Sequence, residues 1–221
     1  MLRVFVGDGG EHGNPLGVFV DGSAVPDGRR QGVAADLGFS ETVFVDDAAT
    51  GRVRIHTPTV ELPFAGHPLV GTAWLLGTAW LLDGPAALRP PAGEVPTWVE
   101  GSVQWIRARP EWAPPFDFVQ YGSAADVEGL DGPPRGLGAA DCWAWADESV
   151  GEVRARVFVP ELGIAEDEAT GAAAVALVAE LGRPVTIRQG RGSVIHARPG
   201  PEGTAEVGGR VVLDEVREYP L

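Results

Sequence analysis

Two strand–loop–helix units dominate the pattern of apolar and polar positions along the chain. In the first, residues 53–57 alternate apolar and polar side chains, which is typical of a half-buried strand. Pro58 and Pro63 then exclude a regular helix or a central strand, so the chain must loop. After Pro68, a residue suited to the first helical position, residues 69–82 are nearly all apolar or small. This composition predicts a central helix over residues 68–82 that is buried on all sides.

The second unit repeats this order nearer the C-terminus. A strand ends at Pro160, a polar loop runs to Gly171, and residues 171–181 predict another buried helix of small apolar residues. Two such units indicate two similar halves, whose helix N-termini can face each other across one cleft. The unpaired backbone N–H groups at a helix N-terminus favour an anion there.

Strands dominate the rest of the chain, with period-two alternation and β-branched or aromatic residues. The predicted strands are residues 2–6, 16–20, 42–45, 98–107, 139–146, 153–159, 184–188, 193–198, 204–207 and 210–214. A short helix is predicted over residues 27–37, with Gly38 as its left-handed cap. Gly208 and Gly209 predict a tight hairpin turn between the last two strands.

A segment rich in Pro, Gly and Ala, residues 83–96, is the best candidate for a linker between the two halves. We therefore predict an N-terminal half of residues 1–96 and a C-terminal half of residues 97–221. The last strand can return to the first half.

Composition excludes some classes of function but does not identify one. Apolar residues make up 44% of the chain and charged residues 22%, which is typical of a globular protein. A formal net charge of −14 argues against nucleic-acid binding as the main function. The one cysteine, Cys142, forms no internal disulfide, so we expect a cytoplasmic location. We see no secretion signal or membrane span, and the four histidines lack metal-ligand spacing.

His67 is the first candidate for chemistry, because it stands where a strand, a loop and a buried helix N-terminus meet. A polar residue just before a helix is, however, often only an N-cap. Asn14, before Pro15, can simply hold a turn. Glu41 opens a predicted strand, where a glutamate is usually a solvated edge charge.

Four motifs in one order change this interpretation. They are residues 13–15 (Gly-Asn-Pro), 39–44 (Phe-Ser-Glu-Thr-Val-Phe), 57–68 (Thr-Pro, then Glu-Leu-Pro-Phe-Ala-Gly-His-Pro) and 163–171 (Gly-Ile-Ala-Glu-Asp-Glu-Ala-Thr-Gly). Together they resemble the PhzF-like isomerase family of phenazine biosynthesis, whose fold is that of diaminopimelate epimerase. The resemblance implies an α+β fold of two similar halves. Each half is a curved, barrel-like, mostly antiparallel or mixed sheet around a central buried helix.

The resemblance also implies an active site between the halves. Glu41 would be the proton-shuttling acid and base, and His67 and Asp167 would line the same pocket. The implied substrate-binding residues are Asn14, Gly66, Thr170, Gly171 and Ala172. No cofactor or metal is used in the family, and its members are commonly homodimers.

Two departures from the family pattern concern the substrate. The usual Asp-Pro-Ala-Thr-Gly-Ser reads Asp-Glu-Ala-Thr-Gly-Ala over residues 167–172, so the hydroxyl after Gly171 is missing. The middle of the chain is also shorter than is usual. A chain with one cysteine cannot use two thiols as acid and base, which excludes two-thiol epimerisation.

We therefore expect a cofactor-independent isomerase that moves a proton on a small carboxylate-bearing substrate. Two alternatives stay open. One is a racemase or epimerase acting on an amino-acid derivative. The other is a non-catalytic small-molecule binding protein on the same scaffold, to which Ala172 gives some support.

Overall fold

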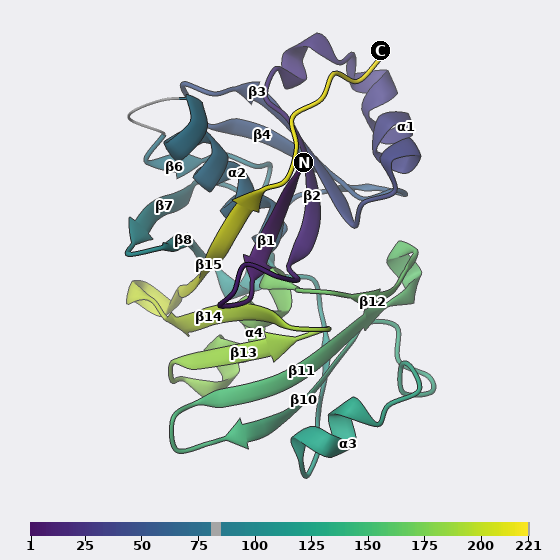
Figure 1. Ribbon diagram of the computed structural model, residues 1–221, viewed down its shortest axis with the longest axis vertical. Coiled ribbons are helices and arrows are strands. Elements are labelled where there is room, and N and C mark those ends of the chain that lie inside the picture. Colours follow the sequence, from purple (N-terminus) through teal and green to yellow (C-terminus); the bar gives the residue numbers. More distant parts are fainter. Residues whose placement is uncertain (81–84, 221) are drawn as a thin grey trace.

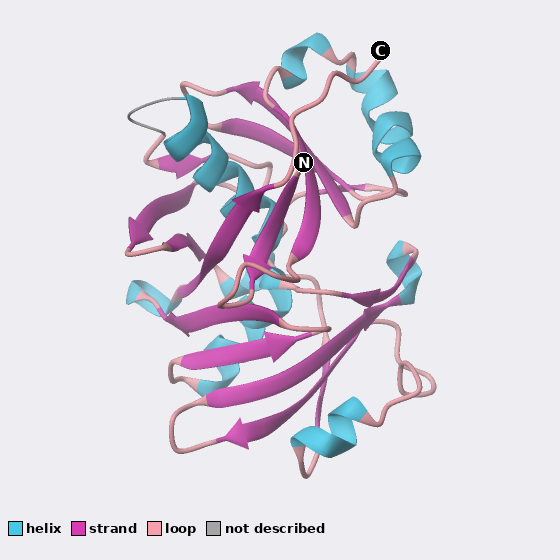
Figure 2. Ribbon diagram, viewed as in Figure 1, coloured by secondary structure: helices cyan, strands magenta, loops and turns pink. Residues whose placement is uncertain are grey.

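Strands are the main regular element of the computed structural model, which describes residues 1–80 and 85–220 (Figures 1 and 2). Within those residues, fifteen strands join into one mixed sheet. Its longest path of neighbouring strands is β5-β4-β3-β2-β1-β15-β14-β13-β11-β10-β9. The combination of a large mixed sheet with a few helices agrees with the predicted α+β class.

The strands in the first part of the chain surround one helix, and those in the last part lie against another (Figure 1). The first group is β1 (Leu2–Val6), β2 (Asn14–Phe19), β3 (Glu41–Asp47), β4 (Arg52–His56), β5 (Glu61–Leu62), β6 (Ala87–Leu88), β7 (Val95–Glu100) and β8 (Val103–Ala108). The second group is β9 (Asp117–Gln120), β10 (Ala140–Asp147), β11 (Glu152–Val159), β12 (Ile164–Asp167), β13 (Val185–Gln189), β14 (Ser193–Pro199) and β15 (Ala205–Leu213).

The two central helices are α2 (Gly66–Leu75) and α4 (Gly171–Leu181). All but one of the ten residues of α2 are buried, as the apolar sequence predicts. The helix continues through a π-helical turn, Leu76–Trp80, and its predicted end at residue 82 lies outside the described residues. Helix α4 has its predicted bounds. Among the described residues no helix is long and apolar enough to cross a membrane.

Two shorter helices lie outside these central ones. Helix α1 (Asp27–Leu37) has its predicted bounds and ends at Gly38, whose φ of 68° is the left-handed cap that glycine favours. Helix α3 (Ala124–Glu128) lies near β10 and β11. The apolar cluster around Cys142 lies on the α3 face of these strands. Ala173 of α4 packs instead against Val157 and Val159, on the other face.

The predicted hairpin at Gly208 and Gly209 is wrong, because β15 runs through both glycines as one strand. Its first half pairs with β14 and β8, and its second half pairs with β1, beside which it lies in Figure 1. A Cβ atom on Gly208 would lie 2.6 Å from the Trp105 ring, and one on Gly209 would overlap Phe5. The glycines therefore permit close packing where the strand changes partners.

The single strand predicted over residues 98–107 is instead the β7–β8 hairpin. Glu100 pairs with Val103, and Gly101 between them has a φ of 62°, which glycine adopts without strain. The preceding segment, expected to be a linker, contributes β6 and the start of β7, and Leu88 is fully buried. The first two residues of that segment, 83 and 84, lie outside the described residues.

The N-termini of α2 and α4 meet at two glycines. A Cβ atom on Gly66 would lie 2.6 Å from the carbonyl carbon of Gly171, and one on Gly171 would lie 2.8 Å from the backbone nitrogen of His67. Real Cβ contacts are not this short, so glycine at both positions lets the helices approach end to end. This contact brings the two predicted loops together.

Candidate active site

The three predicted acid and base residues converge from three elements. Glu41 is the first residue of β3, His67 is the second residue of α2, and Asp167 is the last residue of β12. Their exposed fractions are 8%, 2% and 5%, respectively. Nδ1 of His67 lies 3.4 Å from Oε2 of Glu41. Asp167 is close enough to raise the pKa of Glu41 by charge repulsion.

Asn14 ties the first part of the chain to Asp167. Its amide nitrogen donates to Oδ1 of Asp167 at 2.7 Å and to the carbonyl of Ala169 at 2.9 Å. Its amide oxygen accepts a hydrogen bond of 3.1 Å from the hydroxyl of Ser40. The parallel pairing of β2 with β3, in which Leu16 lies opposite Glu41, brings Asn14 beside Ser40. The side chain thus does more than hold a turn.

Thr170 and Gln189 hold the other side of Asp167. The hydroxyl of Thr170 donates to Oδ2 of Asp167 at 2.7 Å. The amide of Gln189 donates to the Asp167 carbonyl and to the Thr170 hydroxyl, both at 2.9 Å, and accepts from the Thr170 N–H at 3.0 Å. Thr170 therefore orients Asp167 in this structure. Gln189 and Ser40 were not predicted. For Gln189, the sequence shows only a polar residue directly after a predicted strand, which does not reveal its burial.

Burial makes the two carboxyl groups weak acids. It raises the pKa of Glu41 to about 8, with repulsion from Asp167 adding to the effect. Burial also raises the pKa of Asp167 to about 6, although hydrogen bonds from Thr170 and Asn14 favour its charged form. Both carboxyl groups therefore keep their protons to a higher pH than an exposed carboxyl does.

His67 is an uncharged imidazole in this site. Burial lowers the pKa of His67 to about 3, and a hydrogen bond with the Pro15 backbone opposes the shift. Its Nε2 atom and Oε2 of Glu41 are both buried without a hydrogen-bond partner among the described residues. Buried polar atoms are rarely left unpaired, so these two atoms are suited to contact a bound molecule.

Both helix N-termini lie beside these side chains, and the first backbone N–H groups of a helix have no partner within the helix. The N-cap residues are Ala65 for α2 and Thr170 for α4, and neither side chain accepts a capping hydrogen bond. Gly66, Gly171 and Ala172, which are predicted to bind substrate, lie at this junction. Ala172 is 7% exposed and brings no hydroxyl to it. The arrangement can bind an anionic group next to two carboxyls and a neutral imidazole.

Cys142 lies in another apolar cluster, with Ala140 and Phe158. Nowhere in residues 1–80 and 85–220 do three or more His, Cys, Asp or Glu side chains form a group that could hold a metal ion.

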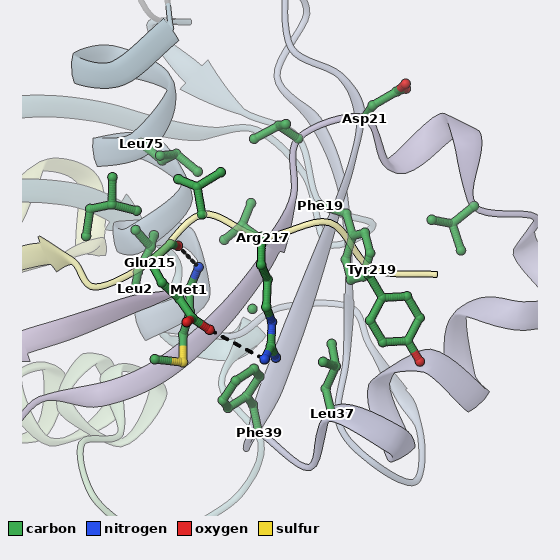
Figure 3. A pocket seen from close by; sticks show the side chains of 16 residues that line it. Met1, Leu2, Phe19, Asp21, Leu37, Phe39, Leu75, Glu215, Arg217 and Tyr219 are labelled. Atoms are coloured by element: carbon green, nitrogen blue, oxygen red, sulfur yellow. Dashed lines mark hydrogen bonds and ion pairs between the residues drawn. The ribbon is translucent and has the colours of Figure 1, made fainter. Parts of the chain in front are cut away.

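A separate cavity of about 270 Å³ lies beside the C-terminal segment, where Leu2 and Phe19 line it (Figure 3). Its wall is mostly apolar and includes Leu2, Phe19 and Leu37, while the C-terminal segment that carries Arg217 and Tyr219 crosses it. None of the three acid and base residues lines this cavity. Glu41 and Asp167 are buried in the candidate site. The separate cavity is open, and its lining contains no comparable group of two carboxyls and an imidazole.

Comparison with known proteins gives a consistent result. The sequence profile of a family described as "Phenazine biosynthesis-like protein" matches residues 4–126. A trans-2,3-dihydro-3-hydroxyanthranilate isomerase from Pseudomonas aeruginosa is 33% identical over 220 residues, which cover 81% of this chain and 78% of that protein.

Two solved structures extend the comparison to the fold. A phenazine biosynthesis PhzC/PhzF protein from Clostridium difficile matches with a TM-score of 0.80, covering 100% of this chain and 98% of its own. At 18% identity, it shows the fold alone. A structure described as a predicted epimerase from Pseudomonas aeruginosa has a TM-score of 0.70 at 27% identity, covering 95% of this chain and 94% of its own. These similarities confirm the predicted fold class.

Proposed function

The chain belongs to the phenazine biosynthesis-like protein family, and on that premise we propose that it is a cofactor-independent isomerase. It moves a proton between carbon atoms of a small carboxylate-bearing substrate. The observation that carries this proposal is the enclosure of Glu41, whose raised pKa of about 8 and unpartnered Oε2 suit a group that takes and returns a proton.

The substrate carboxylate binds at the N-termini of α2 and α4, which have no capping hydrogen bond from the N-cap side chain. Ionised Glu41 removes a proton from one carbon and, as a carboxylic acid, returns it to another. Negative charge that develops on the substrate is stabilised by the same N–H groups. Neutral His67 offers its unpartnered Nε2 to a substrate polar group, and Asp167 stays ionised to fix Asn14 and Thr170.

The name of the 33% identical relative supplies the first compound to test, trans-2,3-dihydro-3-hydroxyanthranilate. The purified protein is incubated with it in deuterated water, and the carbon-bound protons are followed by NMR. We expect deuterium to enter at carbon together with a change in double-bond position. If neither this compound nor other small conjugated carboxylates took up deuterium at carbon, the non-catalytic binding protein would become the better account.

Epimerisation is the second candidate, because Glu41 and Asp167 are two carboxyls in one site and one structural neighbour is described as a predicted epimerase. A pair of acids on opposite faces of a stereocentre can invert it, one removing and the other donating a proton. Chiral chromatography of the product mixture separates the two reactions. Inversion without movement of a double bond would favour the epimerase.

A further inference from the structure

Glu168 is a carboxylate beside the candidate site for which the proposed mechanism has no use. It follows Asp167 in the loop before α4, at the position of the proline in the family's usual Asp-Pro-Ala-Thr-Gly-Ser. Its side chain is only 13% exposed. Oε1 accepts a hydrogen bond of 3.0 Å from the hydroxyl of Ser193 and one of 3.1 Å from the backbone N–H of Arg191. A proline side chain offers no such acceptor, so these contacts are a departure from the family pattern.

Ser193 carries this contact on to the N-terminal part of the chain. It is the first residue of β14 and is fully buried. While its O–H donates to Glu168, its oxygen accepts a hydrogen bond of 3.1 Å from the backbone N–H of Gly13. The backbone of Gly13 has a φ of 88°, and a Cβ atom there would lie 2.7 Å from Cγ1 of Val6. The hydroxyl thus fixes the chain at the residue before Asn14.

These bonds close a ring that contains the contact between Asn14 and Asp167. Glu168 is bonded to Ser193, and Ser193 is bonded to Gly13. Asn14, the next residue along the chain, donates to Oδ1 of Asp167 at 2.7 Å, and Asp167 precedes Glu168. Three segments far apart in sequence meet in this ring. Breaking the ring at the serine therefore frees the backbone that presents the Asn14 amide.

We propose that Ser193 and Glu168 are positioning residues, which hold the amide of Asn14 against the carboxylate of Asp167. Both act through Asn14, and the mechanism assigns no proton to either of them. Removing one member of a buried polar network also leaves its partners unpaired, so the effect extends beyond the bond that is lost. This inference rests on the proposed function for the role of Asp167 in the site.

The titration of Asp167 reports this contact without any substrate. Burial raises the pKa of Asp167 to about 6, the hydrogen bond from Asn14 favours the charged form, and repulsion from Glu168 opposes it. Glu41 and His67 are the other titratable side chains of the site. Carbon-13 NMR of labelled aspartate side chains follows the titration, with Asp167→Asn to assign the signal.

Two substitutions of Glu168 form a matched pair, because both remove its charge and only one removes its hydrogen-bond acceptor. Glu168→Gln keeps an oxygen that accepts from Ser193, so the pKa of Asp167 should fall as the repulsion is lost. In Glu168→Ala the ring is also broken. We expect the pKa of Asp167 in Glu168→Ala to be about one unit higher than in Glu168→Gln, as a weakened hydrogen bond to a charged group would give.

Ser193→Ala breaks the same ring while the charge of Glu168 stays, so the pKa of Asp167 should rise above its wild-type value. Glu166→Gln is the control. Glu166 lies on β12 and pairs with Arg156 at 2.7 Å, and its replacement should leave the titration of Asp167 unchanged.

Urea denaturation of the same variants separates positioning from support of the fold. A residue that only stabilises the fold would lower the denaturant midpoint without moving the titration of Asp167. Equal pKa values of Asp167 in Glu168→Ala and Glu168→Gln would therefore overturn the inference, whatever the midpoints, and leave the proposed function intact. The expected shifts in a protein that exchanges no carbon-bound proton would support the contact and contradict the proposed function.

Discussion

Glu41 carries the proposed chemistry, and replacing it by Gln keeps its size and a polar end while removing the basic carboxylate. General acid–base catalysis contributes roughly 10²- to 10⁴-fold, so turnover by Glu41→Gln should fall by about that factor. Binding of a carboxylate ligand should survive, because the helix N-termini hold it. NMR of deuterium incorporation into the substrate gives the rate for both proteins. Equal rates would remove Glu41 from the mechanism and leave His67 with Asp167.

The same residue predicts a pH dependence of stability. Folding raises the pKa of Glu41 from 4.5 to about 8, so between these pH values the folded protein binds more protons than the unfolded chain. The free energy of unfolding therefore falls as the pH rises through this window, and the full penalty is present above pH 8. Glu41→Gln has no carboxyl at this position, so it does not lose stability from this ionisation as the pH rises.

We therefore expect Glu41→Gln to gain stability relative to wild type on going from pH 5 to pH 9, by on the order of a few kcal/mol. Urea denaturation at both pH values measures the difference. Asp167 is present in both proteins, and its own shift in the same direction cancels to first order. A difference between the two proteins that is independent of pH would show that Glu41 titrates normally in the folded state.

At this scale the motifs predicted the residues that meet in the site, whereas their supporting residues were not predicted. Asn14, Glu41, His67 and Asp167 occur in recognisable local sequence. Gln189 lies directly after a predicted strand, where the sequence shows only a polar residue at a position of unknown burial. Its importance depends on which strands become neighbours, which local sequence does not determine.

Among the elements, the helices agreed with the sequence pattern better than the strand ends did. Helices α1 and α4 have their predicted bounds because caps and periodicity are local signals. The glycine pair in β15 led to the wrong prediction of a hairpin, because glycine is favoured both in turns and at places of close packing. At Gly208 and Gly209 the reason for glycine is the side chains of Trp105 and Phe5, which come from strands far away in sequence.

This packing predicts the effect of a single methyl group. Gly208→Ala should destabilise the protein by about 1–3 kcal/mol, because the new Cβ meets the Trp105 ring at 2.6 Å. Gly28→Ala is the matched control, since a Cβ there has nothing within 4 Å and lies in the first turn of α1. Denaturant midpoints measure both. A neutral Gly208→Ala would show that β15 does not pack this closely against β8.

For the molecule as a whole, the sequence predicted two buried helices whose N-termini face each other across one cleft. In the structure these N-termini are in direct contact at Gly66 and Gly171. The strand that joins the two groups of the sheet, β15, was not predicted as one element, because its pairing with β8, β14 and β1 is set by the complete fold. The division of the chain at residue 96 stays a prediction.

Glu41 lies beside His67, the residue that follows Gly66 in this end-to-end contact, and this gives the last prediction. Gly66→Ala puts a Cβ atom 2.6 Å from the carbonyl carbon of Gly171, so the two helix ends must separate. Water that enters the gap would solvate the Glu41 carboxylate, and the pKa of Glu41 should fall from about 8 toward its ordinary value of 4.5. Activity should fall with it, because the N–H groups no longer converge on one anion.

Carbon-13 NMR of labelled glutamate side chains reports the Glu41 titration, with Glu41→Gln to assign the signal. Gly32→Ala, in the exposed helix α1 with nothing within 4 Å of a new Cβ, is the control and should leave the titration unchanged. An unaltered Glu41 titration in Gly66→Ala would mean that the contact of the helix ends does not enclose the site. In that case the raised pKa of Glu41 would result from burial by the other side chains around it.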